Sequence, residues 1–233
     1  MIFAANFKMN HTRRSTLAWL EEMEARLEGL GSGDAVYCFP PATALCPSTE
    51  RITVGAQNAY PAAKGAYTGE IGLEQLEEFG TRTVLIGHSE RRELLGESQE
   101  TVAEKFRFFA EQGFEIVYCI GEPLEVREQG EEAIYEYLWE EFVGIDADYE
   151  KLIVAYEPIW AIGTGRSAKS EEIAAVHDEL RRRIRRPLLY GGSVKPENIA
   201  GIVAIENVDG VLVGSASLKV ESFFALIQES RGV

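Results

Sequence analysis

The sequence predicts an α/β fold in which eight parallel strands alternate with helices and close into a (β/α)8 barrel. Short apolar runs recur about every 30 residues, which is the size of one strand–helix unit. None of the runs alternates cleanly between apolar and polar residues, and this is typical of strands buried on both faces of a parallel sheet. Several segments between the runs carry apolar residues at steps of three and four, the spacing of one helix face.

The eight apolar runs are four to six residues long and rich in Val, Ile, Leu and Tyr, as strands are. An open, doubly wound sheet is the alternative arrangement of such units, and eight strands favour the closed barrel. The expected strands are Ile2–Asn6, Ala35–Phe39, Ile52–Ala56, Thr83–Gly87, Ile116–Gly121, Leu152–Glu157, Pro187–Gly192 and Val211–Gly214.

Five of the intervening segments have a clear helical period. They are Arg13–Leu30, Gln99–Gln112, Glu131–Val143, Glu171–Arg186 and Ser217–Ser230. We expect Thr12 and Ser170 to cap helix starts, and Gly29, Gly80 and Gly113 to lie at helix ends. The acidic clusters Glu21–Glu24 and Glu140–Glu141 are expected on solvated helix faces.

The charge and composition exclude several classes of protein. Lys and Arg number 23 against 38 Asp and Glu, so the net charge of −15 disfavours a nucleic-acid-binding protein. No stretch approaches the roughly 20 apolar residues of a membrane helix, and the first residues do not resemble a signal peptide. Three cysteines without CxxC spacing predict neither a disulfide framework nor a metal site. We therefore expect one barrel domain over residues 1–233, in the cytoplasm, with no membrane partner.

In such a barrel the active site lies where the strands end, and several polar residues fall at these ends. They are Asn6 and Lys8 after the first strand, His88, Ser89 and Glu90 after the fourth, Glu157 after the sixth, Ser193 after the seventh, and Gly214 and Ser215 after the eighth. The turns GGS and GSAS let backbone N–H groups approach an anion, although either turn alone could simply need glycine. Together, on the last two strands, they favour a phosphate site.

Three of these residues could take part in catalysis. Glu157 could abstract a proton from carbon, or it could cap a helix or form an ion pair. A neutral His88 could donate to a carbonyl oxygen, or it could be structural. Lys8 could be an electrostatic clamp, a Schiff-base nucleophile or a surface lysine. The apolar loop Pro158–Gly165, with glycines at its far end, could be a lid that closes over a ligand, or it could be a loop packed against the barrel rim.

Eight segments of the chain closely resemble the triosephosphate isomerase family. The most specific are GHSERR at Gly87–Arg92 and AYEPIWAIGTG at Ala155–Gly165, and the resemblance extends over the whole chain. The others are NFKMN at Asn6–Asn10, QNAYPAAKGAYTGEIG at Gln57–Gly72, GES at Gly96–Ser98, CIGE at Cys119–Glu122, YGGSV at Tyr190–Val194 and GVLVGSASL at Gly210–Leu218. The resemblance implies a TIM barrel that interconverts dihydroxyacetone phosphate and glyceraldehyde 3-phosphate in glycolysis and gluconeogenesis, without a metal or organic cofactor.

The resemblance also implies roles for individual residues. Asn6 and Lys8 would bind the triose phosphate, His88 would be the electrophile and Glu157 the base, with Ser89 and Glu90 supporting His88. The phosphate would be held by Gly163, Ser193, Gly214 and Ser215. A homodimer is implied, in which the protruding loop Tyr60–Gly69 brings Thr68 close to Lys8 and His88 of the partner subunit.

The chain departs from the family pattern in three respects. Phe7 stands where the family commonly has Trp, Ser215 stands where it commonly has a second Gly, and the chain is somewhat short. Ser215 can still offer its N–H if its φ is negative, and we predict that it is. Two other functions are alternatives: an aldolase that uses Lys8 as a Schiff base, and a phosphate-binding barrel without catalysis.

Overall fold

The structure, a computed structural model, describes residues 1–30, 33–161 and 168–232. Its strands overlap all eight predicted ones. They are β1 (Ile2–Asn6), β2 (Ala35–Phe39), β3 (Ile52–Val54), β4 (Thr83–Ile86), β5 (Glu115–Ile120), β6 (Leu152–Tyr156), β7 (Leu188–Tyr190) and β8 (Gly210–Val213). Several end before the predicted residue, because the last residues leave the ladder to form the barrel mouth; Gly87, for example, has a φ of +76°.

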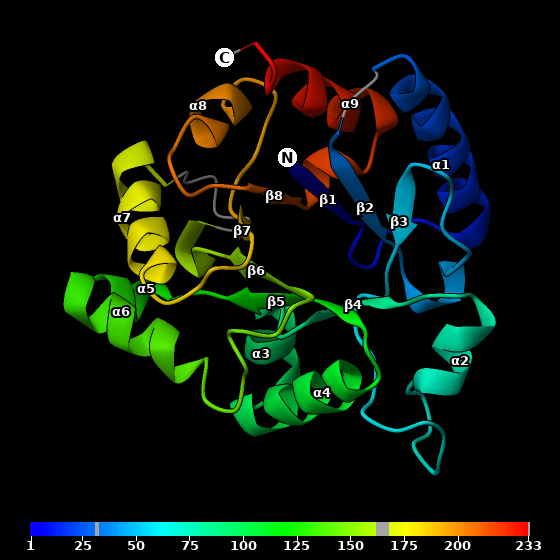
Figure 1. Cartoon of the computed structure of the whole chain (residues 1–233), viewed down its shortest axis with the longest axis horizontal. Coiled ribbons are helices and arrows are strands. Elements are labelled where there is room, and N and C mark those ends of the chain that lie inside the picture. Colours follow the sequence, from blue (N-terminus) through cyan, green and yellow to red (C-terminus); the bar gives the residue numbers. More distant parts are fainter. Residues whose placement is uncertain (31–32, 162–167, 233) are drawn as a thin grey trace.

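The strands form one parallel sheet in the order β3-β2-β1-β8-β7-β6-β5-β4. Its two ends meet just beyond β3, where Ala56 pairs in parallel with Val84 of β4. The Ala56 N–H donates to the Thr83 carbonyl at 2.9 Å, and the Leu85 N–H donates to the Ala56 carbonyl at 2.8 Å. The sheet is thus a closed barrel surrounded by helices (Figure 1), which confirms the predicted fold class and excludes the open sheet.

The five predicted helices are all present with somewhat shorter bounds, and four helices of four to seven residues were missed because they are too short to show a period. The helices are α1 (Arg13–Glu28), α2 (Leu73–Glu78), α3 (Ser89–Leu95), α4 (Gln99–Glu111), α5 (Leu124–Arg127), α6 (Glu131–Glu140), α7 (Ser170–Arg181), α8 (Ile199–Val203) and α9 (Val220–Glu229). Short 3-10 helices at Ala42–Ala44, Ile159–Ala161 and Ser215–Ser217 complete the regular structure of the described residues.

The helix ends agree with the predictions except at one position. Thr12 caps α1 by accepting the Ser15 N–H, and Gly29 is the C-cap of the same helix. Gly80 and Gly113, each with a positive φ, lie one residue beyond the C-caps of α2 and α4. Ser170 is not a cap.

The helix α7 begins at Ser170 itself, and its N-cap is Lys169. The Lys169 N–H donates to the Glu172 carboxylate at 2.8 Å, so the acid in the first turn reaches back and satisfies this backbone group in place of a serine hydroxyl. This reciprocal contact moves the start of the helix one residue ahead of the predicted Glu171.

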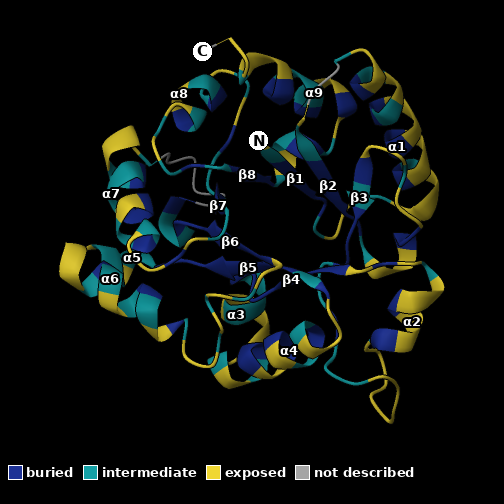
Figure 2. Cartoon of the chain, viewed as in Figure 1, coloured by how far each residue is buried: buried dark blue, intermediate teal, exposed yellow. Residues whose placement is uncertain are grey.

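Two apolar layers enclose the strands, and Figure 2 shows the strands buried and the helices exposed only on their outer faces. Ala4, Leu85, Cys119, Ala155 and Leu212 belong to the inner cluster, which fills the barrel. Neighbouring residues on the same strands pack outward against the helices. Both faces of each strand are therefore apolar, which explains why the runs do not alternate. Across the described residues, none of the helices is long and apolar enough to cross a membrane.

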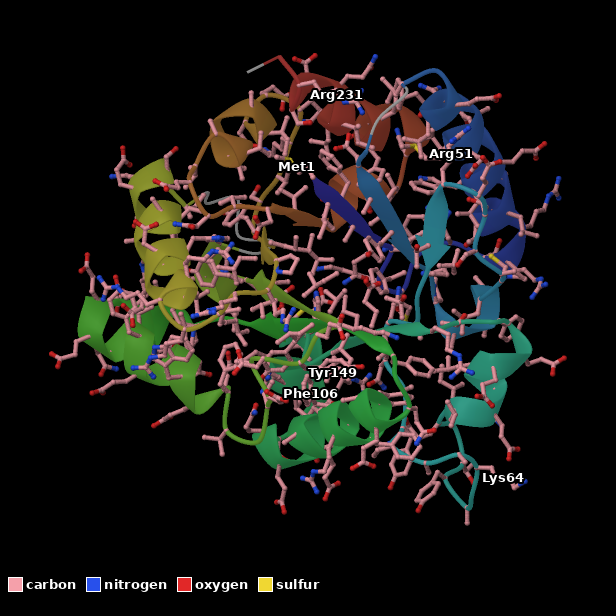
Figure 3. All side chains as sticks on the ribbon, in the orientation of Figure 1. Met1, Arg51, Lys64, Phe106, Tyr149 and Arg231 are labelled. Carbon is pink, nitrogen blue, oxygen red and sulfur yellow. The ribbon has the colours of Figure 1, made fainter. Side chains whose placement is uncertain are left out.

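Charged groups from both ends of the chain, at Met1 and Arg231 (both labelled in Figure 3), meet at Asp34 beside the amino-terminal end of the barrel. The Met1 amino group lies 3.0 Å from the Asp34 carboxylate, and the Arg231 guanidinium lies 2.7 Å from the same carboxylate. This end holds none of the predicted site residues. The carboxyl ends of the strands are left to form the mouth.

Candidate active site

A cavity of about 870 Å³ opens at the carboxyl ends of the strands. It gathers residues from β1, β4, β6, β7 and β8, as the sequence predicted. Of the predicted site residues, Asn6, Lys8, His88, Ser89, Glu90, Glu157, Ser193, Gly214 and Ser215 all line it. Gly163 falls outside the residues that the structure describes, as does half of the predicted lid, residues 162–165.

The end of β1 turns sharply to present Lys8. The Asn6 side-chain oxygen accepts the Lys8 N–H at 3.0 Å, and Lys8 adopts a φ of +50°, in the left-handed region. A non-glycine residue in this region is strained, and surrounding contacts must hold it there. The Gln57 side chain provides one, donating to the Lys8 carbonyl at 2.8 Å. The Lys8 ammonium lies 2.6 Å from the Glu90 carboxylate.

At the end of β4, His88 is the N-cap of α3. Its Nδ1 accepts the Glu90 backbone N–H at 3.2 Å. A backbone amide can only donate, so Nδ1 carries no proton and the proton of the neutral ring lies on Nε2. This Nε2–H points at the Glu157 carboxylate, 3.0 Å away. The helix start therefore selects the tautomer that can donate into the cavity.

Glu157 follows β6 directly, and 2% of it is exposed. Its second carboxylate oxygen accepts the Ser89 N–H at 3.0 Å. Burial alone raises the pKa of Glu157, but the charge and hydrogen bond of His88, the Ser89 N–H and the charge of Lys8 together lower it below its usual value. The carboxylate is therefore ionised at neutral pH.

The same contacts act on the imidazole. Burial lowers the pKa of His88, while the charge and hydrogen bond of Glu157 outweigh burial and raise it. The Glu90 N–H opposes this rise, because a protonated Nδ1 could not accept it. Any group that draws Glu157 away from His88 removes the main support for the imidazolium and leaves a neutral donor.

In the turns after β7 and β8, glycine allows the backbone to lie close to the side chains of Glu157 and Lys8. A Cβ on Gly191 would lie 2.9 Å from Cγ of Glu157, and a Cβ on Gly214 would lie 3.2 Å from Cε of Lys8. Ser215 begins a 3-10 helix. Among the described non-glycine residues only Lys8, His11 and Asn207 have a positive φ, so the predicted negative φ of Ser215 is confirmed.

The described start of the lid segment contacts an acid, Glu122, that is not among the predicted site residues. The Trp160 indole N–H donates to the Glu122 carboxylate at 2.8 Å, and the Tyr156 hydroxyl donates to it at 3.1 Å. Glu122 is fully buried, and burial raises its pKa. The sequence pattern could have identified Glu122, because it lies just beyond an apolar strand, as Glu157 does.

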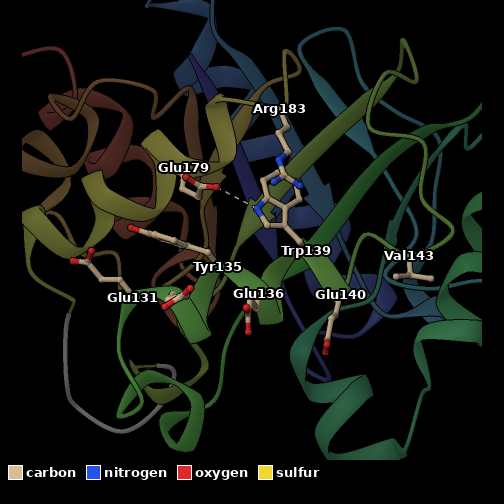
Figure 4. A pocket seen from close by; sticks show the side chains of 9 residues that line it. Glu131, Tyr135, Glu136, Trp139, Glu140, Val143, Glu179 and Arg183 are labelled. Carbon is tan, nitrogen blue, oxygen red and sulfur yellow. Dashed lines mark hydrogen bonds between the residues drawn. The ribbon is translucent and has the colours of Figure 1, made fainter.

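A second hollow, of about 860 Å³, lies on the outer faces of α6 and α7 (Figure 4). Three of its lining side chains contact one another. The Trp139 N–H donates to Glu179 at 3.3 Å, and the Arg183 guanidinium stacks 4.4 Å from the Trp139 ring. It contains none of the predicted site residues. In the described part of the chain, no group of three or more His, Cys, Asp or Glu side chains is arranged to hold a metal ion.

The chain is similar to known proteins over nearly its whole length. Residues 1–230 match the family model described as triosephosphate isomerase. A protein named triosephosphate isomerase from Sulfurovum sp. (strain NBC37-1) is 64% identical over 227 residues, with 97% of this chain and 99% of that protein covered. One of the same name from Sulfurimonas denitrificans is 51% identical over 233 residues, covering 100% of this chain and 97% of its own.

A solved structure has the same fold. The crystal structure of triosephosphate isomerase from Bartonella henselae superimposes with a TM-score of 0.86 at 33% sequence identity, covering 99% of this chain and 98% of that chain. The family model, the relatives and the barrel lead to one conclusion: this chain belongs to the triosephosphate isomerase family, whose enzymes interconvert dihydroxyacetone phosphate and glyceraldehyde 3-phosphate.

Proposed function

We propose that Glu157 carries the proton in this isomerisation and that His88 and Lys8 stabilise the enediolate. The observation that supports this most is the buried, ionised Glu157 carboxylate 3.0 Å from the Nε2–H of His88. A base and a donor to oxygen at this separation can act on adjacent atoms of one small substrate. The reaction is a step of glycolysis and gluconeogenesis.

The proton transfer then proceeds in two steps. Glu157 takes a proton from C1 of dihydroxyacetone phosphate, and the electron pair of that C–H bond forms the C1–C2 double bond while the carbonyl oxygen becomes an oxyanion. His88 donates a hydrogen bond to this oxygen, and the Lys8 ammonium offsets its charge. After a proton moves between the two oxygens, Glu157 returns its proton to C2 and the aldehyde forms at C1.

Glu157 must leave its present partners for this to happen. In the structure its oxygens are occupied by His88 and the Ser89 N–H. A substrate whose carbonyl oxygen takes the His88 donor releases one oxygen, and loss of the Ser89 contact removes a hydrogen bond that favours the carboxylate. Both changes raise the basicity of Glu157 when the substrate is in place.

The activity is tested by coupling glyceraldehyde 3-phosphate isomerisation to reduction of the dihydroxyacetone phosphate formed. We expect turnover without added metal or cofactor. Borohydride trapping with substrate separates this mechanism from the aldolase alternative, because only a Schiff base on Lys8 would leave a covalent adduct. An enzyme that binds inorganic phosphate but does not turn over would be the non-catalytic barrel.

We place the substrate phosphate between Ser193 and the Gly214–Ser215 turn, with Gly163 as a further contact. Ser215→Gly should leave KM for glyceraldehyde 3-phosphate within a few fold of the parent, because the backbone N–H remains. Ser215→Asp should raise KM by at least about tenfold, since a carboxylate beside a phosphate dianion in a low-dielectric site repels it. The KM values of the three proteins, and their inhibition by inorganic phosphate, check this placement. Equal phosphate binding by Ser215→Asp and the parent would contradict it.

We further propose that the chain works as a homodimer. Large apolar side chains close to the mouth are exposed: Met9 at 96%, Leu94 at 78% and Leu95 at 67%. Burying such residues is a common reason for association. The loop Tyr60–Gly69 protrudes beside α2 with Lys64 near its tip (Figures 1 and 3). Within it the Tyr60 and Tyr67 rings lie 4.0 Å apart, so the loop has a packed shape of its own.

Shortening the loop Tyr60–Gly69 is expected to give a monomer with little activity, because Thr68 no longer reaches the partner's mouth. The neck of the loop stays closed by the Tyr60 N–H, which donates to the Ile71 carbonyl at 2.8 Å, so the barrel itself should fold. Sedimentation velocity and the coupled assay, at equal protein concentration, measure both effects, and circular dichroism controls for folding. An intact chain that sediments as a fully active monomer would overturn the dimer.

The remaining proposals concern organisation and location. We propose that residues 1–233 act as one barrel domain in the cytoplasm. Cys38, Cys46 and Cys119 are all free and buried, as is usual for proteins of a reducing compartment. The substrates of the reaction also arise in the cytoplasm, where glycolysis runs.

A further inference from the structure

A buried ion pair joins α3 to the end of α6 behind the mouth. Nε of Arg92 lies 3.4 Å from the Glu141 carboxylate, and the two side chains are only 10% and 8% exposed. The sequence prediction that Glu141 lies on a solvated helix face is therefore wrong. Glu141 is the C-cap of α6, where the chain leaves the helix, and its side chain turns inward.

Arg92 holds the peptide that precedes His88. Its Nε donates to the Gly87 carbonyl at 2.8 Å. Its other nitrogens donate to the Gln99 side chain at 2.8 Å and to the Tyr118 hydroxyl at 3.1 Å, so the planar guanidinium is fixed on several sides. The approach is close: a Cβ on Gly87 would lie 2.8 Å from an Arg92 nitrogen.

Glu141 holds the peptide beneath Glu157. Its carboxylate accepts the Gly121 N–H at 2.8 Å. Gly121 packs directly against the backbone of Glu157, whose carbonyl oxygen would lie 1.7 Å from a Cβ placed on that glycine. The Glu157 N–H also donates to the Ile120 carbonyl at 2.7 Å, so the segment Ile120–Gly121 carries the backbone of the base.

We infer that Arg92 and Glu141 are positioning residues for the isomerisation, because their ion pair joins the peptide before His88 to the peptide beneath Glu157. Neither side chain lines the mouth. Together they set the separation of the base and the donor, which act on adjacent atoms of the substrate. The inference rests on the proposed roles of His88 and Glu157.

The surroundings of Glu141 make glutamine an informative replacement. Burial raises the pKa of Glu141 to about 7, while Arg92 and the Gly121 N–H oppose that rise and the charges of Glu157 and Glu122 add to it. The Tyr118 hydroxyl donates to the Glu141 backbone carbonyl rather than to its carboxylate. The charge of the Glu141 carboxylate also helps to raise the pKa of Tyr137 on α6. Glutamine has the shape of the protonated acid, but it cannot form the ion pair with Arg92.

The test is Glu141→Gln, with kcat and KM measured separately. We expect kcat to fall by about 10–100-fold, since a small displacement of catalytic groups has effects of this size. KM for glyceraldehyde 3-phosphate should change less than about twofold, because the phosphate turns after β7 and β8 do not touch the pair. Arg92→Lys keeps the charge but loses the fixed contact with Gly87. If Glu141→Gln fails to fold, this variant should show the same result, a lower kcat with a nearly unchanged KM.

Asp209→Asn is the matched control. Asp209 also joins a helix to a strand: its carboxylate accepts the Leu188 N–H at 2.7 Å and pairs with Arg181 at 2.5 Å, at the opposite end of the barrel. This variant should lose thermal stability and keep the parental kcat. If Glu141→Gln and Arg92→Lys likewise lose only stability, the pair is structural and the inference is wrong. A parent without isomerase activity would instead remove the proposed function itself.

A double variant, Arg92→Lys with Glu141→Gln, tests whether the two residues act as one unit. If they do, its kcat should be no lower than that of the worse single variant, whereas independent effects would multiply. Multiplied losses would mean that each residue acts separately, and the joint positioning role would be overturned.

Discussion

Glu157→Asp is expected to lower kcat by about 10²–10⁴-fold while KM changes far less, the range that a positioned general base contributes. The substitution keeps the charge and withdraws the carboxylate by one methylene. Proton abstraction from carbon requires near-contact geometry, so the loss appears in the chemical step. The shorter side chain also loses reach to His88 and to the Ser89 N–H, which now hold Glu157 at 3.0 Å each.

The measurement is steady-state kinetics in both directions, with Glu115→Asp as the control. Glu115 lies at the start of β5, at the amino-terminal end of the barrel, and accepts the Tyr37 hydroxyl at 3.1 Å. The same loss of one methylene there should leave kcat at the parental value. A Glu157→Asp enzyme with near-parental kcat would remove Glu157 from the role of base.

His88→Gln should lower kcat by about 10²–10³-fold with the fold intact, which is the usual effect of removing one donor to a developing oxyanion. Glutamine retains an N–H donor, but its amide cannot reproduce both contacts of the ring. The Glu90 N–H now selects the tautomer by donating to Nδ1 at 3.2 Å, and Nε2 faces Glu157 at 3.0 Å. Misplacing this donor leaves the enediolate oxygen less well stabilised.

His177→Gln serves as the control for the second experiment. His177 is also buried, on α7, and its Nδ1 lies 3.0 Å from the Asn207 carbonyl, away from the mouth. Its substitution should lower thermal stability without changing kcat of the folded enzyme. Parental turnover by His88→Gln would show that the neutral imidazole is not the electrophile in this protein.

Most of the fold follows from local pattern in the sequence. A strand that is buried on both faces has a continuous apolar sequence. Each apolar run in this chain forms a strand because the barrel interior and the layer under the helices are both apolar. The polar residues that interrupt these runs at their carboxyl ends, such as Asn6, His88 and Glu157, had to meet at one mouth once the strands were parallel. The candidate site was predictable for this reason.

Contacts between segments far apart in the chain decided the rest. Glu141 lies at the end of a surface helix, and its sequence context predicts an exposed side chain. It is buried because Arg92 and the Gly121 N–H both bind its carboxylate. Ser170 has the side chain of a cap, but the reach of Glu172 to the Lys169 N–H starts α7 at Ser170 itself. The sequence by itself determined the barrel and which polar residues meet at its mouth, since those depend on residue type and period. Only the tertiary structure decided the tautomer of His88, the left-handed backbone of Lys8 and the burial of Glu141, because each depends on which distant backbone and side-chain groups surround it.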